Sequence, residues 1–362
     1  MKALSVMIKP AGGLCNMRCG YCFYRDEMAK RSDSGTAIMT EDTLRAVLEK
    51  VLAAQQCALA FQGGEPTLAG LDFFRTAVRL AAESPCRVSF ALQTNGLLLD
   101  DEWCAFLAEN HFLVGLSLDG PKALHDRYRT DTQGRGTYAG VRRALRLLQK
   151  HRVETNILSV ITSDSCKQVK VCNAFFDENQ LQFRQSIPCL DPLEEPRGAQ
   201  PWSLTPEGYE RYLKGAFDHW YSEQMRGRQA YHRWFENLLM LLNGQMPEAC
   251  GMSGVCGLQY VVEADGSVYP CDFYALDEWR LGNFVTDGLE DIDRRRGELG
   301  FIEQSMHVPP ECKACRWYPL CRNGCYRDRV EGKNYFCRAY QGFFAYAAPR
   351  LEEVYHKRIR SG

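Results

Sequence analysis

The sequence lacks an excess of charge of either sign, and it lacks any long apolar run. Its 44 Lys and Arg residues are balanced by 45 Asp and Glu residues, so the charge gives no support to a nucleic-acid-binding role. The apolar run at residues 238–242 is far shorter than a membrane span. The short apolar start is broken by Lys9 and Pro10 and has no small-residue cleavage site, which argues against a signal peptide. We therefore expect a folded cytoplasmic protein with neither a membrane nor a nucleic-acid partner.

Cysteine, in contrast, is abundant, with 17 among 362 residues. Disulfide bonds are a poor explanation in a reducing compartment, and an odd number of cysteines cannot pair completely. Three cysteines form a tight group near the N-terminus, and eight lie in the C-terminal third. The first group is Cys15, Cys19 and Cys22, and the second is Cys250, Cys256, Cys271, Cys312, Cys315, Cys321, Cys325 and Cys337. This uneven placement indicates two metal-binding regions.

Between residue 3 and about residue 190, apolar strand-like runs alternate with amphipathic stretches. The expected strands are 4–8, 58–62, 87–93, 113–118, 154–161 and 182–187, and the expected helices are 41–54, 71–82, 101–110, 138–150 and 167–179. This alternation predicts a parallel sheet covered by helices, either a partial (β/α) barrel or a doubly wound sheet. In both architectures the active site lies at the C-terminal ends of the strands.

The pattern changes beyond residue 190. Prolines at 192, 196, 201 and 206 indicate a linker, a helical stretch follows over roughly 206–243, and short strands are expected at 258–263 and 267–269. The cysteine-rich turns around those strands predict a region that folds around its metals. The expected domains are a sheet domain at 1–195, a helical linker at 196–245, a cysteine-rich domain at 246–345 and a C-terminal helix at 346–362.

The N-terminal cysteines are spaced Cys15-x3-Cys19-x2-Cys22 directly after the first strand. A structural zinc site takes four protein ligands, and no His or fourth Cys is near these three. A [4Fe–4S] cluster normally takes four cysteines, so three cysteines leave one iron open to an outside ligand. An open position favours a catalytic cluster over a structural one.

The segment CNMRCGYC at residues 15–22 resembles the signature of radical S-adenosylmethionine (SAM) enzymes, and GGEP at 63–66 resembles a second motif of that superfamily. The resemblance implies that SAM chelates the open iron through its amino and carboxylate groups. One electron from the reduced cluster then yields methionine and a 5′-deoxyadenosyl radical that abstracts hydrogen. Polar groups in QTNG at 93–96 and LSLDGP at 116–121 follow the next two strands, where ribose and methionine would bind.

The eight C-terminal cysteines resemble the SPASM extension of peptide-modifying radical SAM enzymes. The resemblance implies two auxiliary [4Fe–4S] clusters with full protein ligation, used for structural support and electron transfer. The implied ligand sets are Cys250, Cys256, Cys271 and Cys325 for one cluster, and Cys312, Cys315, Cys321 and Cys337 for the other. Two structural zinc sites are the main alternative, because Cys-x2-Cys turns often build such sites.

Longer segments resemble the anaerobic sulfatase-maturating enzymes, among them FQGGEPTL at 61–68, FLVGLSLDGP at 112–121, CLDPL at 189–193 and WRLGN at 279–283. This resemblance implies a partial (β/α)6 TIM-like barrel followed by a SPASM domain. It also implies oxidation of a Cys or Ser of a sulfatase to Cα-formylglycine, with electrons from a donor such as ferredoxin or flavodoxin. The family's general base matches Asp272, and its SAM contacts match Tyr21, Gly64, Ser117, Arg129 and Leu190.

An aspartate beside a cluster ligand suits this chemistry. Removing a hydrogen atom from the Cβ of a Cys leaves a carbon radical, and loss of the thiol proton and one electron then gives a thioaldehyde that water converts to the aldehyde. Asp272 would take the proton, and the cluster held by Cys271 would take the electron. The alternatives are a turn role for Asp272, a maturase that crosslinks ribosomally made peptides, and a non-catalytic metal scaffold, against which the three-cysteine site argues.

Six cysteines fit neither cluster pattern: Cys57, Cys86, Cys104, Cys166, Cys172 and Cys189. Packing as small apolar residues explains most of them, and Cys189, beside Leu190, is also a candidate for lining the active site. The run of arginines at 294–296 is interpreted as a solvated helix face.

Overall fold

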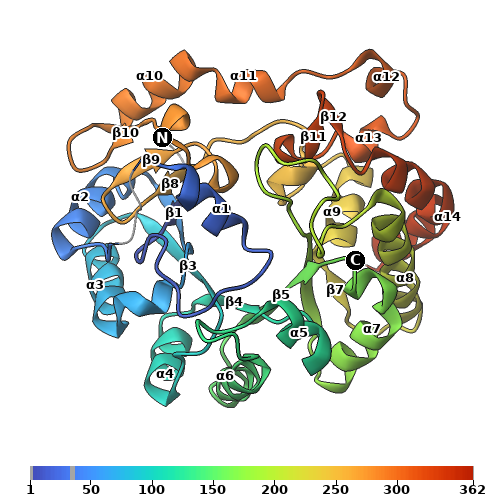
Figure 1. Ribbon diagram of the computed structural model, residues 1–362, viewed down its shortest axis with the longest axis horizontal. Helices are drawn as coiled ribbons and strands as arrows, with labels where there is room; N and C mark the ends of the chain where they lie inside the picture. The colour runs from blue at the N-terminus through green and yellow to red at the C-terminus, as the bar shows by residue number, and fades with distance from the viewer. Residues whose placement is uncertain (1–2, 33–36, 362) are drawn as a thin grey trace. The chain divides into compact units, whose positions relative to one another are not determined.

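The computed structural model describes residues 3–32 and 37–361 (Figure 1). The chain forms two compact units, one of residues 1–118, 126–156 and 258–301, the other of residues 119–125, 157–257 and 302–362. The units therefore cut across the consecutive domains expected from the sequence, because part of the cysteine-rich region clusters with the N-terminal unit. No helix in the described part of the chain combines the length and apolarity needed to cross a membrane.

The first unit is built on a sheet with the strand order β10-β9-β8-β1-β2-β3-β4. Its strands are β1 (Ala3–Ile8), β2 (Gln56–Phe61), β3 (Arg87–Thr94), β4 (Leu113–Ser117), β8 (Tyr260–Val262), β9 (Ser267–Tyr269) and β10 (Gly282–Asn283). Strands β1 to β3 pair in parallel in sequence order, β4 pairs parallel with β3, and β8 pairs parallel with the other side of β1. The carboxyl ends of these five strands therefore share one edge, while β9 and β10 run antiparallel at the border.

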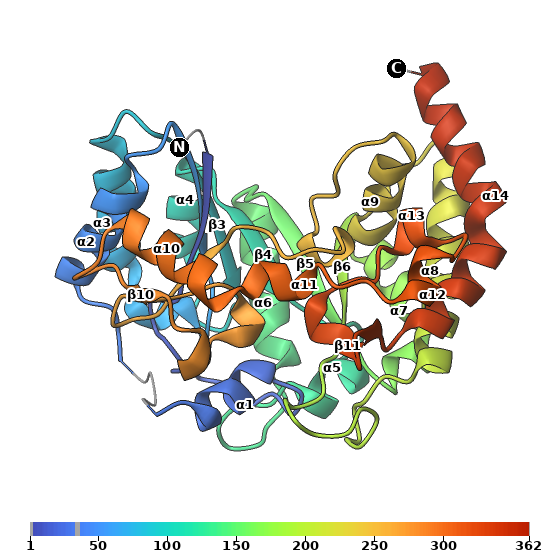
Figure 2. The ribbon, with the colours of Figure 1, turned by 90° about the horizontal axis from the view of Figure 1, so that it is seen from above.

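The first unit holds six helices in its described part. They are α1 (Phe23–Lys30), α2 (Glu41–Val51), α3 (Leu71–Ala82), α4 (Asp101–Glu109), α6 (Tyr138–Lys150) and α10 (Leu289–Leu299), with 3-10 turns η1 (Pro66–Ala69), η4 (Asp272–Tyr274) and η5 (Asp277–Trp279). Of these helices, α2, α3, α4 and α6 match the amphipathic stretches of the sequence. Thr40 caps α2 by accepting a hydrogen bond from the Thr43 N–H at 3.1 Å, as Ser and Thr commonly do. Helices α2 and α3 lie side by side (Figure 2).

The arginine run on α10 is only partly solvated. Arg294 and Arg295 are exposed and pair with acids of their own helix. Arg296, in contrast, is buried, with its guanidinium carbon 4.8 Å from the centroid of the Tyr260 ring. The interpretation of all three as a solvated face was wrong for Arg296, because the helix turns this position toward β8.

The second unit carries a short parallel sheet in the order β5-β6-β7 and most of the remaining helices. Its elements, some of which begin or end in the other unit, are β5 (Thr155–Ile161), β6 (Phe183–Pro188), β7 (Tyr231–His232), β11 (Arg329–Val330), β12 (Lys333–Asn334), η2 (Ser165–Lys167), η3 (Cys250–Met252), η6 (Tyr326–Asp328), α5 (Lys122–Tyr128), α7 (Val169–Glu178), α8 (Pro206–Met225), α9 (Arg233–Leu242), α11 (Phe301–Ser305), α12 (Pro310–Lys313), α13 (Tyr318–Cys321) and α14 (Cys337–Ser361).

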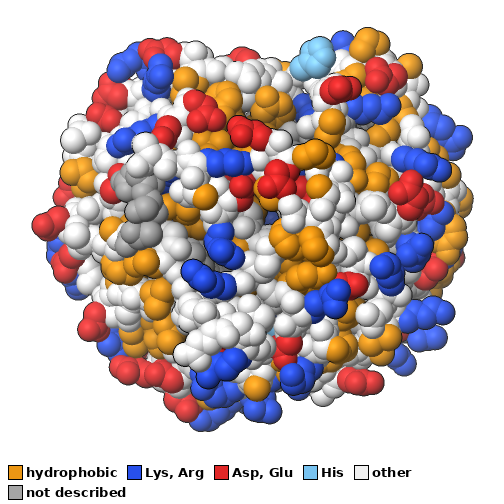
Figure 3. Space-filling model, viewed as in Figure 1, with side chains coloured by type: hydrophobic (Ala, Val, Ile, Leu, Met, Phe, Trp, Pro, Cys, Tyr) orange, Lys and Arg blue, Asp and Glu red, His pale blue; other side chains and the backbone are white. Residues whose placement is uncertain are grey.

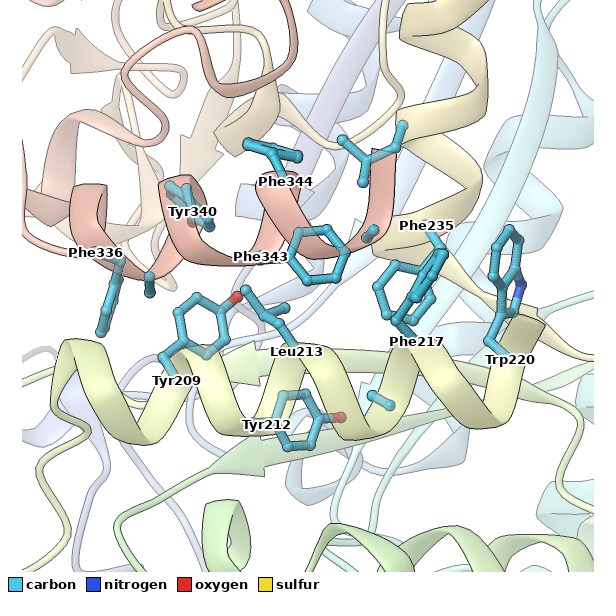
Figure 4. Close-up of a cluster of buried hydrophobic side chains, with 14 of the residues drawn as sticks. Tyr209, Tyr212, Leu213, Phe217, Trp220, Phe235, Phe336, Tyr340, Phe343 and Phe344 are labelled. Carbon is cyan, nitrogen blue, oxygen red and sulfur yellow. The ribbon is translucent and has the colours of Figure 1, made fainter. Parts of the chain in front are cut away.

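An aromatic core joins α8 and α14 in this unit (Figure 4). The ring centroids of Phe217 and Phe343 are 5.6 Å apart, and those of Tyr209 and Phe336 are 4.7 Å apart. Aromatic pairs at such distances add to the stabilisation that burial provides. Helix α14 consequently begins at Cys337, nine residues before the start expected from the sequence, since rings from its first turns pack against α8.

The sequence predictions for the sheet were largely confirmed. All six strands expected between residues 4 and 187 are present, as are the five helices expected among them. The expected helical stretch over 206–243 is interrupted, because Gly227 adopts a φ of 72° and β7 follows it. Positive and negative side chains are interspersed on the face seen in Figure 3, in keeping with a net charge of -1.

Candidate active site

The loop that carries the first three cysteines is fixed by backbone hydrogen bonds to two other segments. The N–H groups of Gly64 and Glu65 donate to the carbonyls of Gly12 and Leu14, each at 2.8 Å. On the other side, the N–H groups of residues 18 and 20 donate to the carbonyls of residues 130 and 128 at 2.7 and 2.8 Å. The loop is therefore held between the GGEP turn and the segment that follows α5.

The three thiols of this loop lie close enough to influence one another's ionisation. Burial, together with the neighbouring Glu65, Cys19 and Cys22, raises the pKa of Cys15 to about 12, although a hydrogen bond from the Met17 N–H opposes the rise. Burial also raises the pKa of Cys22. Because iron binds thiolates, cluster binding must displace these protons. Three grouped cysteines fit an iron–sulfur cluster with one open position.

Glu65 links the ends of two strands beneath this loop. One carboxylate oxygen accepts hydrogen bonds from the Thr67 N–H, the Thr67 hydroxyl and the Thr94 hydroxyl at 3.1, 2.6 and 2.7 Å, and the other accepts from the Asn95 N–H at 2.8 Å. Burial nevertheless raises the pKa of Glu65. The acid of the GGEP motif therefore has a structural task, which is to tie the end of β2 to the end of β3.

Gly64 has a steric reason to be glycine. A Cβ atom at this position would lie 2.1 Å from the Leu14 carbonyl oxygen, which is backbone of the cysteine loop and cannot move away cheaply. We expect Gly64→Ala to displace that loop and to lower the iron content of the first cluster. The auxiliary clusters should load normally, which iron analysis and Mössbauer spectroscopy would measure.

Gly257→Ala is the matched control, because a Cβ there meets no atom within 4 Å. A Gly64→Ala protein that loads as much iron as the control would show that the loop tolerates the added methyl group.

The residues expected to contact SAM are distributed over both units. In the first unit, the Arg129 guanidinium carbon lies 5.5 Å from the centroid of the Tyr21 ring, and its charge acts on Cys22. Gly64 and Ser117 follow or end β2 and β4 on the shared edge. In the second unit, Leu190 lies in the loop after β6, between the buried residues Cys189 and Asp191. Four of the five expected contacts thus belong to the unit that holds the three cysteines.

Asp272 belongs to the same edge of the first unit. Its Oδ1 atom lies 2.7 Å from the Lys9 ammonium nitrogen, and its Oδ2 atom accepts a hydrogen bond from the Gln62 amide at 2.5 Å. Lys9 directly follows β1, and Gln62 directly follows β2. The carboxylate is therefore held by an ion pair and a hydrogen bond from residues at the ends of two neighbouring strands.

Lys9 and Asp272 are part of a larger buried network. Glu263, which follows β8, lies 3.4 Å from the Lys9 nitrogen and 3.1 Å from an Arg31 nitrogen, and both its oxygens accept from the Tyr24 hydroxyl at 2.7 and 2.6 Å. The Lys9 nitrogen also lies 3.7 Å from the centroid of the Tyr24 ring. Each of the buried cations Lys9 and Arg31 thus has a carboxylate beside it, as buried charges require.

Aromatic packing fixes the turn that carries Asp272. Phe273 packs edge-on against Phe23, the first residue of α1, with ring centroids 4.9 Å apart. Tyr274 packs against Phe301 at 5.4 Å. Since α1 begins directly after Cys22, the turn is attached to the helix that leaves the cysteine loop.

In the second unit, four cysteines line a single pocket: Cys312, Cys315, Cys321 and Cys337. They form one of the two ligand sets that the resemblance to the SPASM extension implied. In the described part of the chain, no three His, Cys, Asp or Glu side chains converge on a point for a single metal ion. Four thiols around a pocket fit a cluster whose four irons occupy separate corners.

The other implied set is divided between the units. Cys250, Cys256 and Cys325 influence one another's ionisation in the second unit. The Ser305 hydroxyl accepts a hydrogen bond from the Cys256 N–H at 2.9 Å, and a hydrogen bond from the Ser305 side chain counteracts the rise that burial causes in the pKa of the Cys256 thiol. Cys271 belongs to the first unit, two residues after β9.

Comparison with known proteins identifies the family. Residues 10–164 match the radical SAM superfamily, and residues 255–316 match the SPASM iron–sulfur cluster-binding domain. A cysteine-type anaerobic sulfatase-maturating enzyme of Clostridium perfringens is 43% identical over 98% of this chain and 99% of its own length. The chain belongs to the anaerobic sulfatase-maturating enzymes. A serine-type relative from Bacteroides thetaiotaomicron is 29% identical over 97% of this chain and 91% of its own.

A solved structure agrees with this assignment. The enzyme anSMEcpe with bound AdoMet and Cp18Cys peptide matches with a TM-score of 0.92 and 42% identity, covering 98% of this chain and 99% of that one. The expected fold, a partial (β/α)6 barrel followed by a SPASM domain, is thereby confirmed. This sulfatase-maturating enzyme is a radical SAM oxidoreductase whose cofactors are SAM and three [4Fe–4S] clusters.

The structure also brings forward residues of this sulfatase-maturating enzyme that sequence reasoning left without a role. Lys9, Gln62 and Glu263 surround Asp272 or its partner, and each is a polar residue directly after an apolar strand. Their shared position at the carboxyl edge of parallel strands was a signal available in the sequence. The six remaining cysteines are all buried, in keeping with the packing role expected for most of them.

Proposed function

We propose that this enzyme oxidises a Cys side chain of a sulfatase to Cα-formylglycine. The observation that carries the proposal is the buried Asp272 carboxylate, held by Lys9 and Gln62 at the strand edge that also bears the cysteine loop. The greater similarity to cysteine-type than to serine-type relatives supports Cys as the substrate.

The first cluster and SAM, when bound, supply the radical that removes a hydrogen atom from the substrate Cβ. Cys15, Cys19 and Cys22 would hold the cluster, while Tyr21, Gly64, Ser117, Arg129 and Leu190 would hold SAM. Arg129 is suited to a carboxylate because its guanidinium group stays charged and donates in a fixed geometry. Asp272 accepts the substrate thiol proton through oxygen lone pairs that Lys9 and Gln62 leave free.

The auxiliary clusters, when bound, would supply an acceptor for the remaining electron. Cys271, which would hold one of these clusters, lies directly before Asp272 in the chain, so the proposed proton acceptor adjoins a proposed cluster ligand. Cys325 of one ligand set and Cys321 of the other are four residues apart, so their Cα atoms lie within about 14 Å even in a fully extended chain. We propose that a carrier such as ferredoxin or flavodoxin supplies the low-potential electron, and that the enzyme works in the cytoplasm, where such carriers stay reduced.

The proposal is tested with two sulfatase peptides that differ only in Cys or Ser at the modified position. After anaerobic incubation with SAM and dithionite, we expect formylglycine from the Cys peptide and at least tenfold less from the Ser peptide. Mass spectrometry of the peptides measures formylglycine, and chromatography measures 5′-deoxyadenosine. Formation of 5′-deoxyadenosine without an aldehyde in either peptide would contradict the proposed reaction.

A further inference from the structure

Lys9 is a fully buried cation directly at the proposed base. Its side chain has no exposed surface, and that of Asp272 is 10% exposed. Burial by itself lowers the pKa of Lys9, but Asp272, Tyr24, Glu263 and Glu27 outweigh burial, so the pKa lies well above its ordinary value. The ammonium group therefore stays charged and forms an ion pair with the carboxylate.

The Lys9 side chain is confined along its length. The Lys9 N–H donates to the Val262 carbonyl at 2.8 Å, which fixes the backbone against β8. A Cβ added at Gly63 would lie 3.0 Å from both Cβ and Cγ of Lys9, so the side chain runs close against the GGEP turn. With its far end held between Asp272 and Glu263, the ammonium group has little freedom to move.

Two anchored oxygens determine where the Asp272 carboxylate points. The terminal torsion of an aspartate is broad and roughly two-fold, so a carboxylate without partners rotates easily. Here Lys9 holds Oδ1 and Gln62 holds Oδ2. Because both anchors come from strand ends, the remaining lone pairs keep one direction relative to the sheet edge.

We infer that Lys9 is a positioning residue for proton removal, acting through Asp272 and touching neither SAM nor substrate. This inference rests on the proposed role of Asp272 as the base. A misplacement of about 1 Å can cost about a hundredfold in rate. Loss of the Lys9 contact should therefore slow formylglycine formation, while the radical step and substrate binding continue.

The main test is Lys9→Met, which keeps the length and apolar body of the side chain and removes the ammonium group. We expect formylglycine formation to fall by about a hundredfold with an unchanged KM for the Cys peptide. Production of 5′-deoxyadenosine should continue, so the ratio of deoxyadenosine to formylglycine rises. Deuterium at the substrate Cβ should still reach 5′-deoxyadenosine. Lys9→Gln retains a hydrogen-bond donor, so its formylglycine formation should fall less. The same variant provides the test if Lys9→Met does not fold.

A double-variant cycle distinguishes positioning from general damage, since residues that act as a unit are non-additive. Adding Lys9→Met to Asp272→Asn should cause no further loss of formylglycine. The melting temperature of the double variant should exceed that of Lys9→Met alone. In Lys9→Met the Asp272 carboxylate stays buried without its cation, whereas the double variant has a neutral amide at position 272. Lys30→Met is the matched control, because it removes an ammonium group paired with Asp26 on the same unit at a partly exposed site, and it should leave both products unchanged.

Three results would overturn the inference: normal formylglycine yield in both Lys9 variants, a parallel fall of 5′-deoxyadenosine and formylglycine, or additive losses in the double variant. Normal yield from Asp272→Asn alone is a separate outcome, since it would refute the proposed base and leave Lys9 nothing to position.

Discussion

Asp272→Asn should yield an enzyme that still cleaves SAM but makes very little formylglycine. Asparagine keeps the size of the side chain and an acceptor oxygen for Lys9, and the Gln62 amide can turn over to meet the new NH2 group. The Lys9 ammonium group retains Glu263 at 3.4 Å and the Tyr24 ring, so the buried cation remains compensated. The variant should therefore fold and bind three clusters.

The substitution slows proton transfer from the substrate thiol, because an amide cannot accept this proton at ordinary pH. Positioned general bases contribute about 10²–10⁴-fold, so formylglycine formation should fall by at least two orders of magnitude. Tyr24 offers no ready substitute, because burial raises its pKa well above the ordinary value and its hydroxyl donates to Glu263. Anaerobic assays of peptide aldehyde and 5′-deoxyadenosine on the same samples measure both steps.

Asp277→Asn is the matched control for this experiment. Asp277 lies a few residues further along, in an exposed turn where it accepts from the Ser32 N–H at 2.8 Å. Its replacement should leave both products unchanged. Formylglycine at near-normal yield from Asp272→Asn would remove this residue as the base and direct attention to a water molecule held near the cluster loop.

Local sequence patterns were sufficient for the repeating half of the fold. Alternating apolar runs predicted each strand between residues 4 and 187 to within about two residues at either end, because buried parallel strands are apolar throughout. The resemblance of the C-terminal cysteines to the SPASM pattern likewise implied which four thiols share a pocket in the second unit. In both cases the signal lies within a short stretch of chain.

Contacts between distant segments were not predictable in the same way. Strand β8 has only three residues and pairs with β1, more than 250 residues away in the chain, so no local pattern reports its partner. The contact between Lys9 and Asp272 depends on that pairing. The early start of α14 depends equally on rings of α8 that the helix meets only in the folded state.

Replacing Cys15, Cys19 and Cys22 together by Ala should abolish SAM cleavage completely. Three [4Fe–4S] clusters correspond to about 12 Fe per chain, so the triple variant should retain about 8 Fe. The loop itself should persist, because backbone hydrogen bonds to residues 64, 65, 128 and 130 hold it independently of the thiols. The ligand pocket of the second unit contains none of the replaced residues.

The matched control is a triple replacement of Cys57, Cys86 and Cys104 by Ala, which removes three buried cysteines of the same unit that fit neither cluster pattern. This control should keep about 12 Fe and full SAM cleavage. Iron and zinc are measured together after anaerobic reconstitution. Zinc in place of iron, or iron for only one cluster in the unaltered protein, would contradict the assignment of two auxiliary clusters. An equal loss of iron in both triple variants would contradict the assignment of the loop thiols as ligands. In that case, removing three loop cysteines would lower the iron content no more than removing three buried cysteines.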